Sequence, residues 1–140
     1  MGKIIQKLDS LRDFPLLFIR LVLAYGFYAP AMMKMKDVGS IGEWFASMNI
    51  PFPTLSAYLV TGAEVSGIVL LTLGLFTRYI SVVLIFSMIV AIKTVHWGNG
   101  FEAGNNGFEI PLYYMIMLFT LFIYGAGRLS LDKLIGKKYL

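Results

Sequence analysis

Apolar residues in this chain gather in long blocks rather than at alternating positions. Four blocks cover residues 14–33, 55–76, 79–97 and 110–127. Each approaches the roughly 20 mainly apolar residues that a helix needs to cross the hydrocarbon core of a bilayer. The pattern therefore predicts an all-α fold, a polytopic membrane protein with a bundle of four transmembrane helices.

A shorter amphipathic segment lies between the first two blocks. Ile41, Trp44, Phe45 and Met48 recur at helical spacing and define one apolar face. Ser40 and Glu43 fit a capping box, which marks the start of a helix. We predict a short interfacial helix over residues 41–48, with the alternative that this helix plugs one end of the bundle.

Composition decides which solvent the blocks face. Of the 140 residues, 58% are hydrophobic and 14% are charged, and the mean hydropathy is +0.75. Such a chain has too little polar surface to coat a soluble globule. We expect one membrane domain over 1–140 in contact with the lipid bilayer, with no room for a nucleotide-binding domain.

The distribution of lysine and arginine predicts the orientation. Eight of these residues flank the blocks on one side: Lys3, Lys7, Arg12, Arg78, Arg128, Lys133, Lys137 and Lys138. Only Lys34 and Lys36 lie in the loops expected on the other side. The positive-inside rule then places both termini in the cytoplasm. The net charge of +4 is explained by this topology, and we expect no nucleic-acid partner.

Cysteine is absent from the chain. Thiol relays, disulfide exchange and cysteine-ligated iron–sulfur clusters are therefore excluded. We expect no intrinsic cofactor, so that a redox role would need a borrowed cofactor or a protein partner carrying the redox centre. A homo-oligomer stays open.

Ionisable residues within the blocks are the strongest functional signal, because each costs about 2.5–3.5 kcal/mol at the centre of a membrane helix. They are Arg20, Glu64 and Lys93, with His96 and Glu109 near the outer boundary. Glu64 and Lys93 fall at nearly the same depth, and His96 is expected one helical turn above Lys93. Tyr28, Tyr58 and Tyr113 are expected at the same outer level.

These side chains are predicted to converge on a polar site open to the outer side. The alternative is a structural network in which Glu64 pairs with Arg20 or Lys93, and Glu109 pairs with His96. One histidine and two glutamates are a thin ligand set, so we expect no metal site.

Several motifs resemble the DoxX family of small bacterial membrane proteins. They are the run 45–53, Gly62-Ala-Glu64-Val-Ser-Gly67, Gly74-Leu-Phe-Thr-Arg78, Arg20-Leu, Lys34, His96, Glu109-Ile-Pro and Gly127-Arg-Leu-Ser-Leu-Asp132. The resemblance implies a bacterial inner-membrane protein connected with respiratory or sulfur redox chemistry, since related DoxD proteins form a subunit of a thiosulfate:quinone oxidoreductase. It marks Arg20, Glu64, His96 and Glu109 as functional candidates.

Two function classes follow. In the first, the protein is a quinone-interacting subunit of a respiratory or thiol-linked oxidoreductase system rather than a stand-alone enzyme. His96 and Lys93 would donate hydrogen bonds at one end of the quinone ring, and Arg20 or Tyr28 at the other. The walls would be Tyr58 and Tyr113, and Glu64 or Glu109 would accept protons. In the second class, it is a membrane assembly factor or a carrier for a small lipophilic or metal-bearing molecule.

Overall fold

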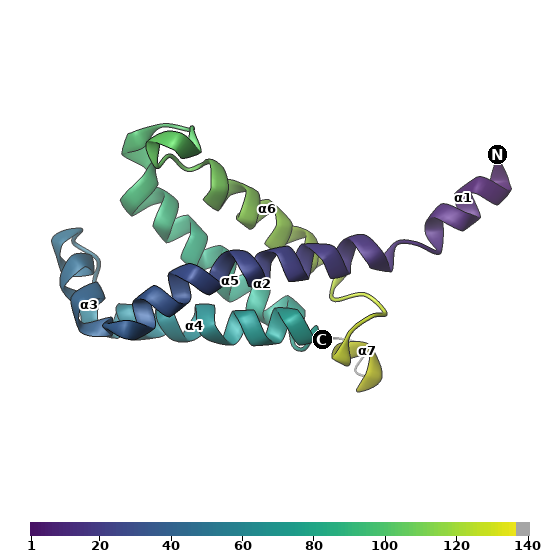
Figure 1. The fold of residues 1–140 in the computed structure, drawn as a ribbon, viewed down its shortest axis with the longest axis horizontal. Coiled ribbons are helices and arrows are strands. Elements are labelled where there is room, and N and C mark those ends of the chain that lie inside the picture. The colour runs from purple at the N-terminus through teal and green to yellow at the C-terminus, as the bar shows by residue number, and fades with distance from the viewer. Residues whose placement is uncertain (137–140) are drawn as a thin grey trace.

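The computed structural model describes residues 1–136, which fold into helices joined by short connections (Figure 1). The α-helices are α1 (Gly2–Asp9), α2 (Asp13–Lys36), α3 (Val38–Ser47), α4 (Pro53–Leu73), α5 (Thr77–Ala91), α6 (Glu109–Tyr124) and α7 (Leu131–Leu134). A π-helical turn, η1 (Ile92–His96), continues α5, and two 3-10 turns follow, η2 (Trp97–Asn99) and η3 (Ala103–Asn105).

All four apolar blocks form helices. Three helical segments are long and apolar enough to cross a membrane: Gly2–Lys36, Pro53–Leu73 and Thr77–Asn99. Helix α6 is apolar but has only 16 residues, which corresponds to about 24 Å. The chain is therefore an all-helical membrane protein, and the count of four spans stays a prediction.

Glycine and aspartate set the helix ends. Gly74, with φ of 69°, adopts the left-handed conformation that ends α4 at Leu73 rather than at the expected residue 76. At the start of α3, the Asp37 carboxylate accepts a hydrogen bond from the Ser40 amide at 3.1 Å. The expected capping box was wrong, because Asp37 caps the helix three residues before Ser40 and α3 begins at Val38.

The core of the bundle lies where α2, α4, α5 and α6 meet. Leu23 and Phe27 of α2, Leu71 of α4, Leu84 of α5 and Leu118 of α6 are almost fully buried there. Gly67 lets α4 approach α5, since a Cβ atom at this position would lie 2.8 Å from Leu84. Outside the core, large apolar side chains such as Phe86 and Tyr25 are exposed on the helix flanks, as expected for surfaces that face lipid.

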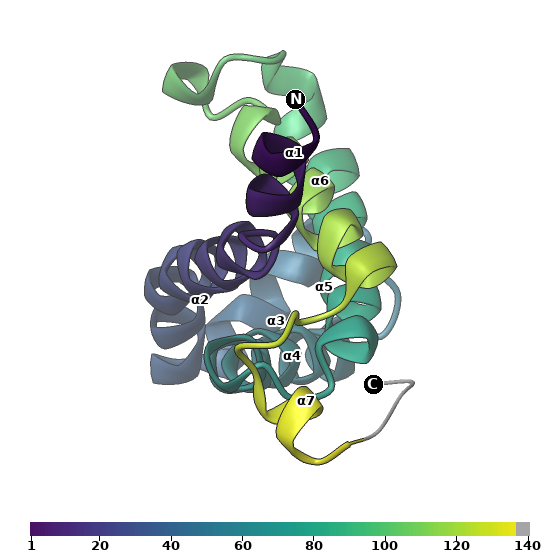
Figure 2. The ribbon, with the colours of Figure 1, turned by 90° about the vertical axis from the view of Figure 1, so that its right-hand side faces the viewer.

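Successive long helices run in opposite directions, so the connections gather at two ends (Figures 1 and 2). One end carries α1, the turn around Arg78 and α7; we call it the α7 end. The other carries α3 and the segment from η1 to η3; we call it the α3 end. The basic residues counted on the predicted cytoplasmic side lie at the α7 end, except Lys137 and Lys138, which fall outside the described residues.

Candidate functional site

A buried ion pair joins α2 to α4 in the half of the bundle toward the α3 end. The Nζ atom of Lys34 lies 3.0 Å from Oε1 and 2.8 Å from Oε2 of Glu64. The two side chains are only 13% and 5% exposed. This contact confirms the prediction that Glu64 is ion-paired. Pairing is expected here, because a paired charge is far less costly to bury than a single one.

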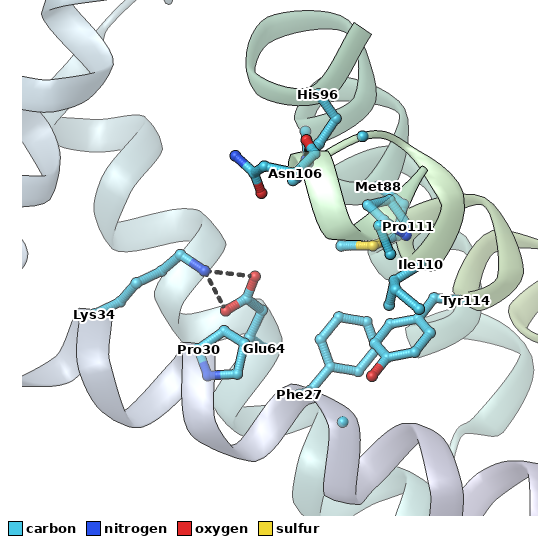
Figure 3. Close-up of a pocket in the computed structure, with 14 residues that line it drawn as sticks. Phe27, Pro30, Lys34, Glu64, Met88, His96, Asn106, Ile110, Pro111 and Tyr114 are labelled. Carbon is cyan, nitrogen blue, oxygen red and sulfur yellow. Dashed lines mark hydrogen bonds and ion pairs between the residues drawn. The ribbon is translucent and has the colours of Figure 1, made fainter. Parts of the chain in front are cut away.

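The partner of Glu64 differs from the prediction, which named Arg20 or Lys93. Helix α2 continues to Lys36 instead of ending at residue 33, so Lys34 belongs to its last turn rather than to an outer loop. From this position the long lysine stem turns into the bundle and reaches Glu64 near the middle of α4 (Figure 3).

The ion pair faces a pocket of about 290 Å³, which we call the headgroup pocket. Phe27 and Tyr114 form an aromatic wall with ring centroids 5.4 Å apart. Pro30, Met88, Ile110 and Pro111 complete the apolar lining, and His96 and Asn106 lie at the side opposite Phe27 (Figure 3). An apolar pocket with a few convergent polar groups is the usual form of a small-molecule site.

His96 enters this pocket from the π-helical turn η1. Its Nδ1 lies 2.9 Å from the carbonyl oxygen of Asn106. A carbonyl only accepts hydrogen bonds, so Nδ1 carries the proton. In the neutral ring Nε2 is then an acceptor, and it becomes a donor when the ring is protonated. The expected pair of His96 with Glu109 was wrong, because the Glu109 carboxylate accepts from the Ala103 amide at 2.8 Å and the Tyr113 hydroxyl at 3.1 Å.

Lys93 lies outside the headgroup pocket, although His96 is only three residues away. It is exposed and lines a separate groove of about 580 Å³ with Ile89, Trp97 and Met115. The prediction placed Lys93 and His96 on one face of an α-helix. The wider turn of a π-helix changes this register, and such turns recur at functional sites.

Arg20 lies near the α7 end, remote from the pocket. Its guanidinium is fully buried and donates to the Leu71 carbonyl at 3.1 Å and to the Leu129 carbonyl. Fourteen residues of α2 separate it from Lys34, a rise of about 21 Å. The expectation that Arg20 reaches toward Glu64 was therefore wrong.

The remaining predicted residues lie on exposed surfaces. Tyr28, Tyr58 and Tyr113 are 55%, 59% and 44% exposed, and none of them lines the headgroup pocket. The structure thus brings together Glu64 and His96 of the predicted set. It adds Lys34, Phe27 and Tyr114, which the prediction did not include.

The sequence matches the family model DoxX over residues 15–97, more than half of the chain. The chain belongs to the DoxX family. An uncharacterised Haemophilus influenzae protein is 33% identical over 132 residues, which cover 89% of this chain and 85% of the relative. The Bacillus subtilis protein named "Putative oxidoreductase CatD" is 29% identical over 126 residues, which cover 87% of this chain and 89% of the relative. The Escherichia coli protein named "Inner membrane protein YphA" is 29% identical over 123 residues, which cover 84% of this chain and 88% of the relative. No solved structure matches the chain.

The DoxX match includes the polar side of the pocket but not its whole wall. Lys34, Glu64 and His96 lie within residues 15–97, whereas Asn106 and Tyr114 lie beyond them. The sequence could have indicated that Lys34 belongs to the first long helix, because no strong helix-breaking residue follows Pro30 before Asp37 and Gly39. Phe27 is adjacent in sequence to Tyr28, and Tyr114 to Tyr113, two of the tyrosines that were predicted to line the site. One residue along a helix turns the side chain by about 100° around the axis.

Proposed function

We propose that this DoxX-family protein is the quinone-binding membrane subunit of an oxidoreductase system. The observation that carries the proposal is the buried Lys34–Glu64 pair, which faces an apolar, aromatic-walled pocket together with His96. A relative named "Putative oxidoreductase CatD" is in keeping with a redox role. When bound, a quinone would supply the capacity to take up two electrons and two protons.

The residues of the headgroup pocket fit a quinone ring. An ammonium group has three N–H donors, and two hydrogen bonds join Lys34 to Glu64, which leaves one donor for a ligand carbonyl. His96 offers Nε2 for the second oxygen, as donor or acceptor according to its protonation. Phe27 and Tyr114 provide flat walls for the ring.

The ion pair would hold these donors in place before a ligand arrives. Glu64 fixes the Lys34 ammonium at two oxygens, and the Asn106 carbonyl fixes the His96 ring. A site whose polar groups are already oriented loses less free energy when it orders a ligand. His96 is also the side chain that can take a proton from the bound ligand or return it.

The electrons would come from a partner protein, because the chain has no cysteine for a thiol relay or cluster. We propose a location in the bacterial inner membrane with four spans and both termini in the cytoplasm. Support comes from the relative named "Inner membrane protein YphA" and from the basic residues near the α7 end. In this orientation the headgroup pocket lies toward the outer side, on the same side as α3.

Titration of the purified protein with a soluble quinone analogue tests the proposal. We expect saturable binding by the wild type and about tenfold weaker binding by His96→Ala, which corresponds to the loss of one hydrogen bond of about 1.4 kcal/mol. Lys93→Ala is the matched control, because Lys93 lies outside the pocket, and it should bind like the wild type. Absence of binding by the wild type, or equal loss in both variants, would favour the assembly-factor or carrier function.

A further inference from the structure

A second cavity adjoins the headgroup pocket across the ion pair. It has a volume of about 450 Å³, and we call it the inner chamber. Lys34, Glu64, Met88 and His96 line both cavities. On its far side the chamber is bounded by Trp44 and Phe45 of α3, Ile50, Val60 of α4 and Val90 of α5.

A third cavity continues from the inner chamber toward the lipid. It is a groove of about 520 Å³ between α4 and α5, which we call the lateral groove. Val60 and Ser87 line both the chamber and this groove, so they form the junction between them. Along α4 the groove extends from Ser56 to Ala63, about 10 Å. One turn beyond Ala63, the contact between Gly67 and Leu84 brings α4 and α5 together and limits the groove.

Away from the ion pair, His96 and Asn106, the chamber and the groove make no polar demand on a ligand. Their hydroxyl side chains donate to nearby backbone carbonyls: Ser87 to Val83 at 3.3 Å, Thr94 to Val90 at 2.7 Å and Ser56 to Pro51 at 2.8 Å. A ligand that fills this path therefore needs polar atoms at one end only. The rest of the ligand must be an apolar chain, because none of the described residues that line the groove has a charged or amide side chain.

We propose that the inner chamber and the lateral groove bind the isoprenoid tail of a prenylated quinone whose ring occupies the headgroup pocket. The tail passes between Val60 and Ser87 and leaves the protein between α4 and α5. This assignment rests on the proposed function. It adds a second binding region, made by α3, α4 and α5, and a lateral entrance from the bilayer.

The three cavities select one chain with a small uncharged polar end. A phospholipid would bring a charged phosphate and two acyl chains to a path with a single junction at Val60 and Ser87. The aromatic and branched side chains of the chamber, Trp44, Phe45, Ile50 and Val90, match the methyl-branched surface of an isoprenoid chain. The groove beside Lys93 shares no lining residue with these cavities, so it is not part of the path.

Binding of three analogues to the full-length protein in nanodiscs tests the inference. The analogues share one quinone ring and carry no tail, a straight alkyl tail, or an isoprenoid tail of the same length. We expect the isoprenoid tail to strengthen binding to the wild type by about tenfold or more over the ring alone, because apolar surface enters the chamber. We expect the straight tail to give a smaller gain.

Val60→Trp, which fills the junction, should remove most of the gain from the tail and leave the affinity for the ring alone within about twofold. Val69→Trp is the control, because Val69 lies on the same helix, is 52% exposed and lines none of the three cavities. It should bind all analogues like the wild type. Ser87→Leu narrows the junction from α5 and should act like Val60→Trp, which guards against a folding defect in one variant.

The outcomes separate the two proposals. A wild type that binds the ring but gains nothing from an isoprenoid tail overturns the tail assignment alone. Equal gain from straight and isoprenoid tails, or equal loss in Val60→Trp and Val69→Trp, also overturns it. A wild type that binds none of the analogues overturns the proposed function together with the tail path.

Discussion

Lys34 in the last turn of α2 donates to both carboxylate oxygens of Glu64, near the middle of α4, at 3.0 and 2.8 Å. Among the described residues, neither side chain forms an ion pair within its own helix, so each charge is balanced by the residue on the other helix. The pair therefore fixes α2 against α4 and also supplies the polar side of the headgroup pocket.

The first prediction concerns this pair. Lys34→Met should destabilise the bundle by about 3–5 kcal/mol, because it leaves a buried carboxylate without its partner. Glu64→Gln should cost less than Glu64→Leu, since the amide oxygen still accepts from Lys34. The double variant Lys34→Met with Glu64→Leu should recover most of the loss. Thermal unfolding in detergent measures these differences; additive losses in the double variant would show that the pair is not coupled.

The second prediction compares two glycines of one helix region. Gly74 has φ of 69°, and a Cβ atom there would collide with the Arg20 guanidinium and with Ser130. At Gly62, no atom of the described residues outside the adjoining helix backbone lies within 4 Å of such a Cβ atom. Gly74→Ala should therefore destabilise the protein by about 1–3 kcal/mol, whereas Gly62→Ala should stabilise α4 by about 0.5–1 kcal/mol. Unfolding temperatures of the two variants check this, and equal shifts would contradict it.

Residue chemistry predicted part of the candidate site. Glu64 and His96 were found because an ionisable side chain in an apolar block is costly and needs a reason. Lys34 was missed because the expected helix end at residue 33 placed it in a loop, and helix ends are the least certain feature of a sequence-based assignment. An error of three residues thus changed the partner assigned to Glu64.

Periodicity could not predict which side of each helix points into the bundle. In a lipid-embedded helix both faces are apolar, so the sequence pattern does not distinguish Tyr113, which is exposed, from Tyr114, which lines the pocket. Gly26 carried an indirect signal for Tyr114, because the tyrosine hydroxyl lies where a side chain at residue 26 would be. The π-helical turn at Ile92–His96, which separates His96 from Lys93, has no comparable signal in the sequence.

The third prediction concerns the α7 end. The Asp132 carboxylate accepts hydrogen bonds from the amides of Phe76 at 2.8 Å and Thr77 at 3.2 Å, and so caps the start of α5 from a distant part of the chain. Asp132→Ala should cost about 1–2 kcal/mol, as for other lost helix caps, and Asp132→Asn should cost less. Asp9→Ala is the control, because its ion pair with Arg12 is largely exposed and should contribute less than about 0.5 kcal/mol. If both alanine variants unfold at the wild-type temperature, the cap does not stabilise the bundle.

The fourth prediction concerns topology and uses the absence of cysteine. Single cysteines at Ser10, Asn105 and Leu134 place one thiol near the start of α2, one between α5 and α6, and one in α7. With four spans and cytoplasmic termini, a membrane-impermeant maleimide should label Asn105→Cys in intact cells. Ser10→Cys and Leu134→Cys should be labelled only after the membrane is permeabilised.

The same variants distinguish four spans from three. Helix α6 has 16 residues, about 24 Å of helix, and it must cross a core of about 30 Å if Asn105 and Leu134 are on opposite sides. Flanking residues and local thinning of the bilayer can accommodate such a difference. Labelling of both Asn105→Cys and Leu134→Cys from outside would show that α6 does not cross. Labelling of Ser10→Cys and Leu134→Cys, but not of Asn105→Cys, would show the inverted four-span orientation. A cysteine at Ser66, exposed on the flank of α4, is the control that should stay unlabelled in intact cells, because a thiol within lipid is inaccessible to the reagent.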